Sequence, residues 1–355
     1  MMLWQYTEEQ QDILISARLH KYGKICGKME SPHSRLYTLD NNGRHPPIVA
    51  KGIYLDPALP SGEQKQGLSR ALYEINNAYA VCHHILIHRF VDLAGVFGIP
   101  FLISPKRSDT LDNVIASHKI EITEALSICV QMAHAISYCK DNGILCHQDL
   151  KPANIYLEKW PEEFPIRWRV KIADFELGNA FLFLRYPYGS RPYMAPEQYE
   201  LIPTDVSPND FANVDVFAIG VMLYEMITGG RHPIGEETGL VWPFPISDKS
   251  NKWKRETPWK KWLKNGAPFV GDTADLDPDT LAAIRACLEI APYKRPSAEQ
   301  LSTLLMERLC QIDESAYMCL AVNLRDFDKM ASESKQEGWP YYDQLVENIN
   351  EAFPD

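Results

Sequence analysis

Two short segments constrain what this chain can fold into more than any other part of its sequence. The first is CHQDLKPANI at 146–155, and the second is KIADFEL at 171–177. Together they set two acids, one lysine and one asparagine at fixed offsets: Asp149, Lys151, Asn154 and Asp174. Transfer of a phosphoryl group to a hydroxyl depends mainly on positioning and charge neutralisation, and these are the groups that it needs.

Each of the four side chains suits one role in such a site. Asp149 can accept or orient the proton of the hydroxyl, and Lys151 can steady the γ-phosphate. Asn154 and Asp174 each offer an oxygen atom, the kind of ligand that Mg²⁺ prefers. A loop rich in turn and cap residues would give a similar string without any chemistry, so the rest of the chain has to support the interpretation.

Both segments resemble the protein kinase family, whose catalytic loop reads H-R-D-x-K-x-x-N and is followed by D-F-G. Two later segments resemble the same family: GSRPYMAPE at 189–197 is similar to the end of an activation segment, and DVFAIGVMLYEMITGG at 215–230 to the buried helix of the large lobe. Asp215 and Arg295 match structural residues of that lobe. The resemblance implies an α+β, two-lobed fold with a small β-rich lobe and a large helical lobe.

We therefore expect a kinase N-lobe at 1–104, a C-lobe at 105–311 and a C-terminal helical extension at 312–355. From Ile13 to Tyr54 short apolar runs alternate with turn clusters, which indicates a small antiparallel sheet. In the extension, two helical stripes of apolar residues predict a pair of helices that packs on the large lobe. A partner-binding or autoinhibitory tail is the alternative.

The resemblance assigns nucleotide-binding residues in the first part. IVAKGIY is similar to the kinase strand whose lysine contacts the α- and β-phosphates of ATP, which implies that role for Lys51. Glu74 lies on a stretch with helical spacing and is the expected partner of Lys51, with Glu63 as the alternative. The glycines of the phosphate-covering loop fall on other residues here: Met29, Ser31 and Ser34. Glycine lets backbone amides approach phosphate closely, so this loop departs from the pattern, although serine hydroxyls can still donate.

The segment GIPFLISPKRSD then supplies the adenine side of the expected site. It reads as a buried strand followed by the hinge between lobes. The resemblance places Ile103 near the back of the adenine pocket and gives Ser104 and Lys106 to the hinge. Pro105 has no N–H, so one donor that a hinge can offer is absent there.

The segment after Asp174 bears on the acceptor. Ser190 occupies the threonine slot of the G-T-x-x-Y-x-A-P-E pattern, where the hydroxyl bonds the catalytic aspartate and lysine of Ser/Thr kinases. Lys151, two residues after Asp149, is likewise the choice of Ser/Thr kinases. The resemblance thus implies a serine/threonine protein kinase that uses ATP with Mg²⁺ or Mn²⁺ and acts on a protein substrate.

Two departures set this chain apart from the family pattern. Gln148 stands in place of the arginine that usually binds an activation-loop phosphate, so activation by loop phosphorylation is not expected. Glu176 replaces the glycine of D-F-G and brings a third carboxylate close to the metal ligands. We expect Glu176 to turn toward the site when nucleotide is bound; the alternative is that it points away and bonds a backbone or basic group.

Two other functions fit parts of the sequence. Small-molecule kinases of the aminoglycoside and choline type share H-x-D-x-x-x-x-N and often read D-x-E, but Lys151, the A-P-E motif, Asp215 and Arg295 are features of a protein-substrate platform. A pseudokinase scaffold fits the missing glycines. The joint presence of Lys51, Asp149, Asn154 and Asp174 opposes it.

The composition excludes some partners. A formal net charge of −11 argues against nucleic acid, whose binding is driven by basic surface.

The eight cysteines form no C-x-x-C pair, and the N-terminus does not resemble a signal peptide. The longest apolar run, 214–228, is interrupted by acids and too short for a bilayer. We expect a cytoplasmic protein without a membrane segment.

One basic stretch stands out in this acidic chain. Residues 249–264 hold seven basic side chains interleaved with three tryptophans. A docking surface for an acidic regulatory partner is one interpretation. The other, which we favour, is an amphipathic helix with its tryptophans inward and its lysines outward.

Overall fold

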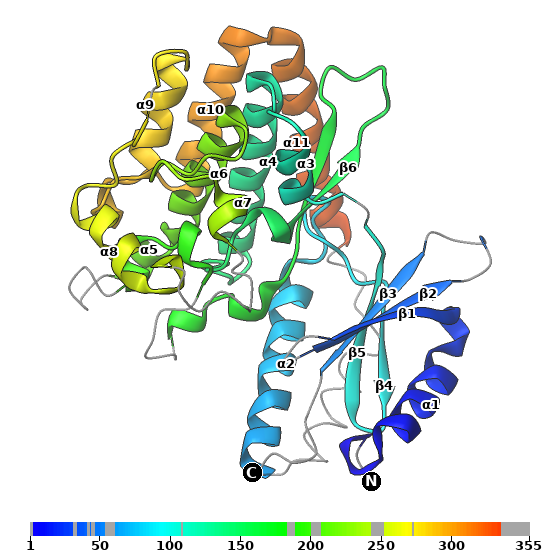
Figure 1. Ribbon diagram of the computed structural model, residues 1–355. Helices are drawn as coiled ribbons and strands as arrows, with labels where there is room; N and C mark the ends of the chain where they lie inside the picture. Colours follow the sequence, from blue (N-terminus) through cyan, green and yellow to red (C-terminus); the bar gives the residue numbers. More distant parts are fainter. Residues whose placement is uncertain are drawn as a thin grey trace. The chain divides into compact units, whose positions relative to one another are not determined.

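The computed structural model describes residues 3–30, 34–40, 43, 47–53, 61–107, 109–182, 189–199, 207–242, 252–271 and 273–334 (Figure 1). The chain divides into two compact units. Among the described residues, the first contains 3–83, 89–107 and 332–334, and the second contains 84–88 and 109–331. A sheet dominates the first unit and helices dominate the second, which confirms the predicted α+β fold. The lobe boundaries at 104/105 and 311/312 remain predictions.

The first unit is built on a five-stranded antiparallel sheet with the order β1-β2-β3-β5-β4. Its strands are β1 (Lys24–Glu30), β2 (Ser34–Asp40), β3 (Ile48–Ile53), β4 (Asp92–Val96) and β5 (Ile99–Pro105). Gly52 lies directly opposite Phe101, and a Cβ atom at Gly52 would meet the phenylalanine ring at 2.3 Å. Glycine at this point of β3 therefore makes room for a large core side chain.

The segment expected to begin the sheet is a helix instead, which corrects the prediction for Ile13 to Leu19. Helix α1 (Glu8–Leu19) opens with a capping box in which Thr7 and Gln10 bond each other's backbone N–H groups. Gln11, Ile15 and Leu19 are buried at a spacing of four, so one face of the helix packs on the sheet. In this segment the helical spacing of the buried residues and the capping box favour a helix, although its short apolar runs had indicated a strand.

The two faces of the sheet have different covers. Helix α1 covers one face, where Ile15 and Leu19 share a core with Tyr37, Ala50 and Ile103. Helix α2 (Ser61–Val81) contributes to the smaller core on the other face: Leu72, Ile75, Phe90, Leu93 and Leu102. Because strand side chains alternate, β4 and β5 contribute to both cores.

The second unit surrounds a helix that is buried on all sides. In α6 (Val214–Thr228) every residue except Thr228 is buried, as expected of a core helix. The other helices are α3 (Leu111–Ser117), α4 (Ile122–Asp141), α5 (Pro208–Phe211), α7 (Thr238–Val241), α8 (Glu256–Lys264), α9 (Pro278–Cys287), α10 (Ala298–Ile312) and α11 (Glu314–Ser334). Strands β6 (Ile155–Lys159) and β7 (Trp168–Ile172) form a separate hairpin.

Short 3₁₀ turns link these elements. They are η1 (Leu3–Gln5), η2 (His20–Tyr22), η3 (Pro152–Asn154), η4 (Phe175–Leu177), η5 (Ala180–Leu182), η6 (Arg191–Tyr193), η7 (Pro196–Tyr199), η8 (Lys252–Lys254) and η9 (Pro292–Lys294). Turns η3 to η7 carry the motifs singled out in the sequence. The site is therefore held by short turns on a helical frame.

The tryptophans of the basic stretch point inward, as the favoured interpretation predicts. Trp253, Trp259 and Trp262 are buried, whereas Lys261 and Lys264 are exposed. The indole N–H of Trp259 donates to the carbonyl of Trp253 at 3.1 Å. Residues 249–251 lie outside the described part of the chain. A regulatory partner for this stretch stays a prediction.

Helix α11 corresponds to the first predicted stripe of the extension. Its buried residues Leu320, Leu324 and Phe327 face the second unit, and Phe327 stacks on Trp160 at 6.1 Å. The second stripe, within 342–353, lies outside the described residues. No helix in the described ranges combines the length and apolar character needed to cross a membrane.

Candidate active site

The backbone of the loop that carries Asp149 is held by hydrogen bonds to a buried acid. Asp215, at the start of α6, accepts hydrogen bonds from the backbone N–H groups of His147 at 2.6 Å and Gln148 at 2.9 Å. Burial raises the pKa of Asp215 to about 6, against the effect of His147 and these N–H donors. Gln148 has a positive φ of 70°, so the loop turns sharply just before Asp149.

Asp149, Lys151 and Ser190 form one connected group. Lys151 Nζ lies 2.7 Å from Asp149 Oδ2 and 3.1 Å from Ser190 Oγ. The resemblance implied that the Ser190 hydroxyl bonds both partners, but the structure differs in one contact. The backbone N–H of Ser190, and not its hydroxyl, donates to Asp149 Oδ1 at 2.7 Å. Both carboxylate oxygens of Asp149 are thus oriented.

The three predicted metal ligands lie on neighbouring segments of the second unit. Asn154 ends turn η3, where its Nδ2 atom donates to the carbonyl of Asp149 at 3.0 Å, which leaves the amide oxygen as the ligand atom. The Ala173 amide donates to the Asn154 carbonyl at 2.9 Å and so brings the next residue, Asp174, beside Asn154. Asp174 is left-handed, with φ 69°, and one of its oxygens lies within 4.8 Å of one from Glu176. Three oxygen donors suit Mg²⁺ or Mn²⁺.

Lys51 and Glu74 form an ion pair in the first unit. The distance from Lys51 Nζ to Glu74 Oε1 is 2.6 Å, and the Glu74 side chain is 10% exposed. Of the two predicted partners, Glu74 makes this contact; the side chain of Glu63 lies outside the described set. Lys51 projects from β3 and Glu74 from α2, so the pair ties the sheet to the helix.

The register of β5 corrects the prediction for Ile103. Ile103 lies opposite Ala50 and belongs to the core under α1, whereas Leu102 lies opposite Lys51. Residues directly opposite on paired strands share a face, and successive residues alternate. Ile103 therefore faces away from Lys51, and Leu102 with Ser104 occupies the lysine face. The sequence signal that could have shown this is the alternation of side chains along a strand, which puts Leu102 and Ile103 on opposite faces.

The other predicted nucleotide contacts have mixed positions. Ser104 is buried in β5 opposite Val49. Lys106 is exposed, and its backbone N–H donates to the Pro47 carbonyl at 2.7 Å. Ser34 begins β2, and Ser31 lies outside the described residues.

Gln148 has a structural role that sequence reasoning missed. Its side-chain oxygen accepts the N–H of Phe181 at 2.9 Å, and its carbonyl accepts from Gln198 Nε2 at 2.9 Å. Phe181 in turn stacks on Phe211 at 4.3 Å. The aromatic residues Phe183 and Tyr188, which follow Phe181 in the sequence, lie outside the described residues.

A buried ion pair fixes the end of the segment. Arg295 and Glu197 form two contacts, NH1 to Oε1 at 2.5 Å and NH2 to Oε2 at 2.9 Å, and their side chains are almost fully buried. Arg295 was matched in the sequence to a structural residue of the large lobe, and its partner Glu197 belongs to the A-P-E motif. Removing one partner of such a pair leaves a buried charge and costs about 3–5 kcal/mol.

A cavity of about 690 Å³ lies beside Lys151 and Ser190 within the second unit. Its lining includes three carboxylates that sequence reasoning did not select: Asp112, Glu225 and Glu237. Glu225 accepts from the Tyr193 hydroxyl at 3.1 Å and from the Thr238 hydroxyl. Burial raises the pKa of Glu225 to about 8. Lys151 and Ser190 thus face a space that is also lined by acidic side chains.

Comparison with known sequences agrees with this geometry. The sequence model described as "Protein kinase domain" matches residues 61–304. That is more than half of the chain, so the chain belongs to the protein kinase domain family. The match begins after β3, so it does not include the strand that carries Lys51 or the hairpin with the missing glycines.

Individual kinases show the same relationship at low identity. Sperm motility kinase Z of Mus musculus is 29% identical over 194 residues, which is 46% of this chain and 36% of that protein. The carbon catabolite-derepressing protein kinase of Secale cereale is 32% identical over 129 residues, 35% of this chain and 23% of that protein. MAP kinase-interacting serine/threonine-protein kinase 2 of Xenopus laevis is 36% identical over 117 residues, 30% and 24% of the two chains. The chain thus spans little more than a third of these relatives at most.

Proposed function

We propose that this protein transfers the γ-phosphate of ATP to serine or threonine hydroxyls of a protein substrate. The observation that carries the proposal is the group of Asp149, Lys151 and Ser190. An acid oriented through both oxygens, with an ammonium group 2.7 Å away, can hold an acceptor hydroxyl and neutralise charge on the transferred group.

The candidate phosphate contact belongs to the first unit, and the candidate metal ligands belong to the second. Lys51, paired with Glu74, is the contact for the α- and β-phosphates. Asn154, Asp174 and Glu176 would hold Mg²⁺ or Mn²⁺. When bound, the metal neutralises phosphate charge. Asn154, Asp174 and Glu176 would present their oxygen atoms to the metal. The hydrogen bond from Asn154 Nδ2 to the Asp149 carbonyl links this metal site to the loop that carries Asp149.

The cavity beside Ser190 is lined by residues of several elements, and its volume suits a small molecule as well as a side chain. The residues that anchor the platform support a protein acceptor. The Arg295–Glu197 pair and Asp215 anchor the platform on which a protein segment would lie. The ion pair between Asp149 and Lys151 supports a catalytically active kinase over a pseudokinase scaffold.

Asp149→Asn is the decisive variant. Its amide cannot take the hydroxyl proton, so transfer of label from radioactive ATP to protein should fall by at least about a hundredfold. Binding of a fluorescent ATP analogue should stay within about twofold, because Asp149 is an acceptor-side group. Lys51→Ala should instead weaken binding of the fluorescent ATP analogue, because Lys51 is the proposed phosphate contact.

The assay uses a panel of protein and small-molecule acceptors. Labelling of an aminoglycoside or of choline, with no labelling of proteins, would show that the acceptor class is wrong. Equal transfer by the wild type and Asp149→Asn on every acceptor would exclude the proposed site.

A further inference from the structure

The strands that replace the glycine-rich loop are tied to helix α1 by a charged cluster. On β1 and β2 the cations are Lys28 and Arg35, and their partners on α1 are Glu8, Gln11 and Asp12. All of these residues lie in the first unit. We call the five residues the α1 clamp.

Arg35 is the centre of the α1 clamp. Its side chain is only 4% exposed. Its NH2 atom lies 3.1 Å from Glu8 Oε1, its NH1 atom donates to Gln11 Oε1 at 3.2 Å, and its Nε atom lies 3.1 Å from Glu30 Oε1. Exposed ion pairs contribute little by themselves. A buried guanidinium is different, because it stays ionised and needs partners for its charge.

Lys28 makes the second connection. Its Nζ atom lies 3.0 Å from both carboxylate oxygens of Asp12 and 3.0 Å from Glu30 Oε1. Asp12 also accepts the Tyr37 hydroxyl at 3.2 Å. Lys28 and Tyr37 lie directly opposite on β1 and β2. The helix therefore holds both strands close to the turn that joins them.

The opposite face of the same strands carries the nucleotide residues. Ser34 and Leu36 flank Arg35 in β2, so they lie on the other face of the sheet. Leu36 lies directly opposite Lys51. Fixing Arg35 on the α1 face thus fixes the position of Ser34 and Leu36 relative to Lys51.

We propose that the α1 clamp positions strands β1 and β2, and with them Ser34 and Leu36 relative to Lys51, for nucleotide binding, and so offsets the absence of glycines at Met29 and Ser34. This inference rests on the proposed function, because it concerns the ATP site. A preorganised hairpin loses less conformational freedom on binding than a mobile one. The clamp residues are positioning residues, since none of them lies on the Lys51 face.

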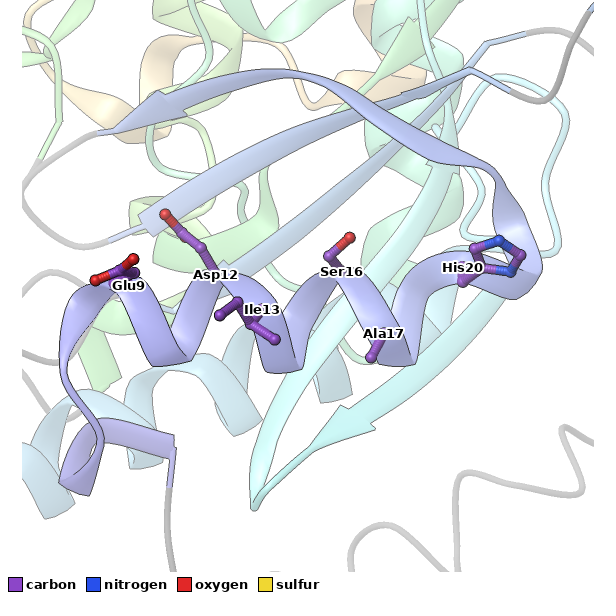
Figure 2. A pocket seen from close by; sticks show the side chains of 6 residues that line it. All are labelled: Glu9, Asp12, Ile13, Ser16, Ala17 and His20. Carbon is purple, nitrogen blue, oxygen red and sulfur yellow. The ribbon is translucent and has the colours of Figure 1, made fainter.

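The test removes charge from the helix and leaves the strands intact. In Glu8→Gln with Asp12→Asn, Arg35 and Lys28 lose their charged partners on α1, while Ile15 and Leu19 still hold the helix on the sheet. Glu9→Gln is the charge control, since Glu9 is exposed on α1 and lines the same surface pocket as Asp12, as Figure 2 shows. Asp12→Asn alone measures the Lys28 connection.

We would measure the Kd of a fluorescent ATP analogue with Mg²⁺ at 20 °C. The double variant should bind about tenfold more weakly, a change of 1.4 kcal/mol, and Glu9→Gln should bind like the wild type. The kcat at saturating ATP should not change, because the Asp149 group is untouched. Backbone N–H groups of β1 and β2 should exchange with deuterium faster in the double variant.

Three results overturn the inference. The first is an unchanged Kd in the double variant together with a lower melting temperature, which would make the clamp a stabilising contact only. The second is equal weakening by Glu9→Gln. The third is a wild type that binds no nucleotide, which removes the proposed function as well; nucleotide binding and transfer by the wild type, with an unchanged Kd in the variant, remove the inference alone.

Discussion

Single residues carry the departures of this chain from the kinase pattern. Glu176 stands where the family has glycine, and one of its oxygens lies within 4.8 Å of one from Asp174. Two carboxylates at this distance repel each other unless a cation or hydrogen bonds neutralise them. The orientation of Glu176 toward a bound metal stays a prediction.

The prediction for Glu176 concerns metal affinity. Glu176→Gly should raise the Mg²⁺ concentration for half-maximal transfer by about threefold to tenfold, since one oxygen donor is lost while Asn154 and Asp174 remain. Titrating MgCl₂ against rate in both proteins gives the midpoints, with ATP saturating. Equal midpoints would make Glu176 a structural substitution.

A second residue-scale prediction uses the buried acid Glu225. Burial raises its pKa from 4.5 to about 8, so between these values the folded protein holds a proton that the unfolded chain releases. The free energy of unfolding therefore falls as pH rises from 5 to 8, by up to on the order of 4 kcal/mol from this group. Glu225→Gln, which mimics the protonated form, should remove that part of the slope.

Denaturant unfolding of the wild type and Glu225→Gln at pH 5.5, 7 and 8.5 checks the sign. The difference between the two proteins should move in favour of the variant as pH rises, because other groups cancel. A constant difference across this range would mean that Glu225 is ionised throughout.

At the scale of elements, the described residues of the segment after Asp174 are held by contacts of Gln148 and Phe181. Gln148 binds the Phe181 backbone and Gln198, and Phe181 stacks on Phe211. A neutral amide offers no charge to a phosphoryl group, yet it satisfies backbone groups that would otherwise be unpaired. Helix α6 supports the same region through Asp215.

This arrangement predicts activity without loop phosphorylation. Complete phosphatase treatment should leave transfer within about twofold of the untreated protein, because the contacts of Gln148 need no phosphate. Mass spectrometry confirms that phosphate has been removed. A tenfold loss of activity would refute the role assigned to Gln148.

At the scale of the whole molecule, the two units carry different parts of the proposed chemistry. The first holds the Lys51–Glu74 pair and the α1 clamp, and the second holds Asp149, its partners and the metal ligands. The family match at 61–304 includes all of the second group but begins after Lys51. The part of the chain outside the match is the part where α1 supplies contacts that the pattern does not predict.

The sequence by itself determined the fold class and most of the acceptor side of the site. Asp149, Lys151, Asn154 and Asp174 are close in sequence, so short turns of known geometry bring them together. Helix α6 was equally readable, because a run of that length with only two acids among its apolar residues has to be buried.

Only the tertiary structure decided what depends on pairing between distant segments. The register of β3 with β5 placed Leu102 and not Ile103 opposite Lys51, and a shift of one residue reverses the face of every side chain. The contact in which Arg35 of β2 is buried against Glu8 of α1 likewise joins segments that are distant in sequence. Burial also set the pKa of Glu225, since that value depends on neighbours such as Tyr193 and Thr238 that the local sequence does not reveal.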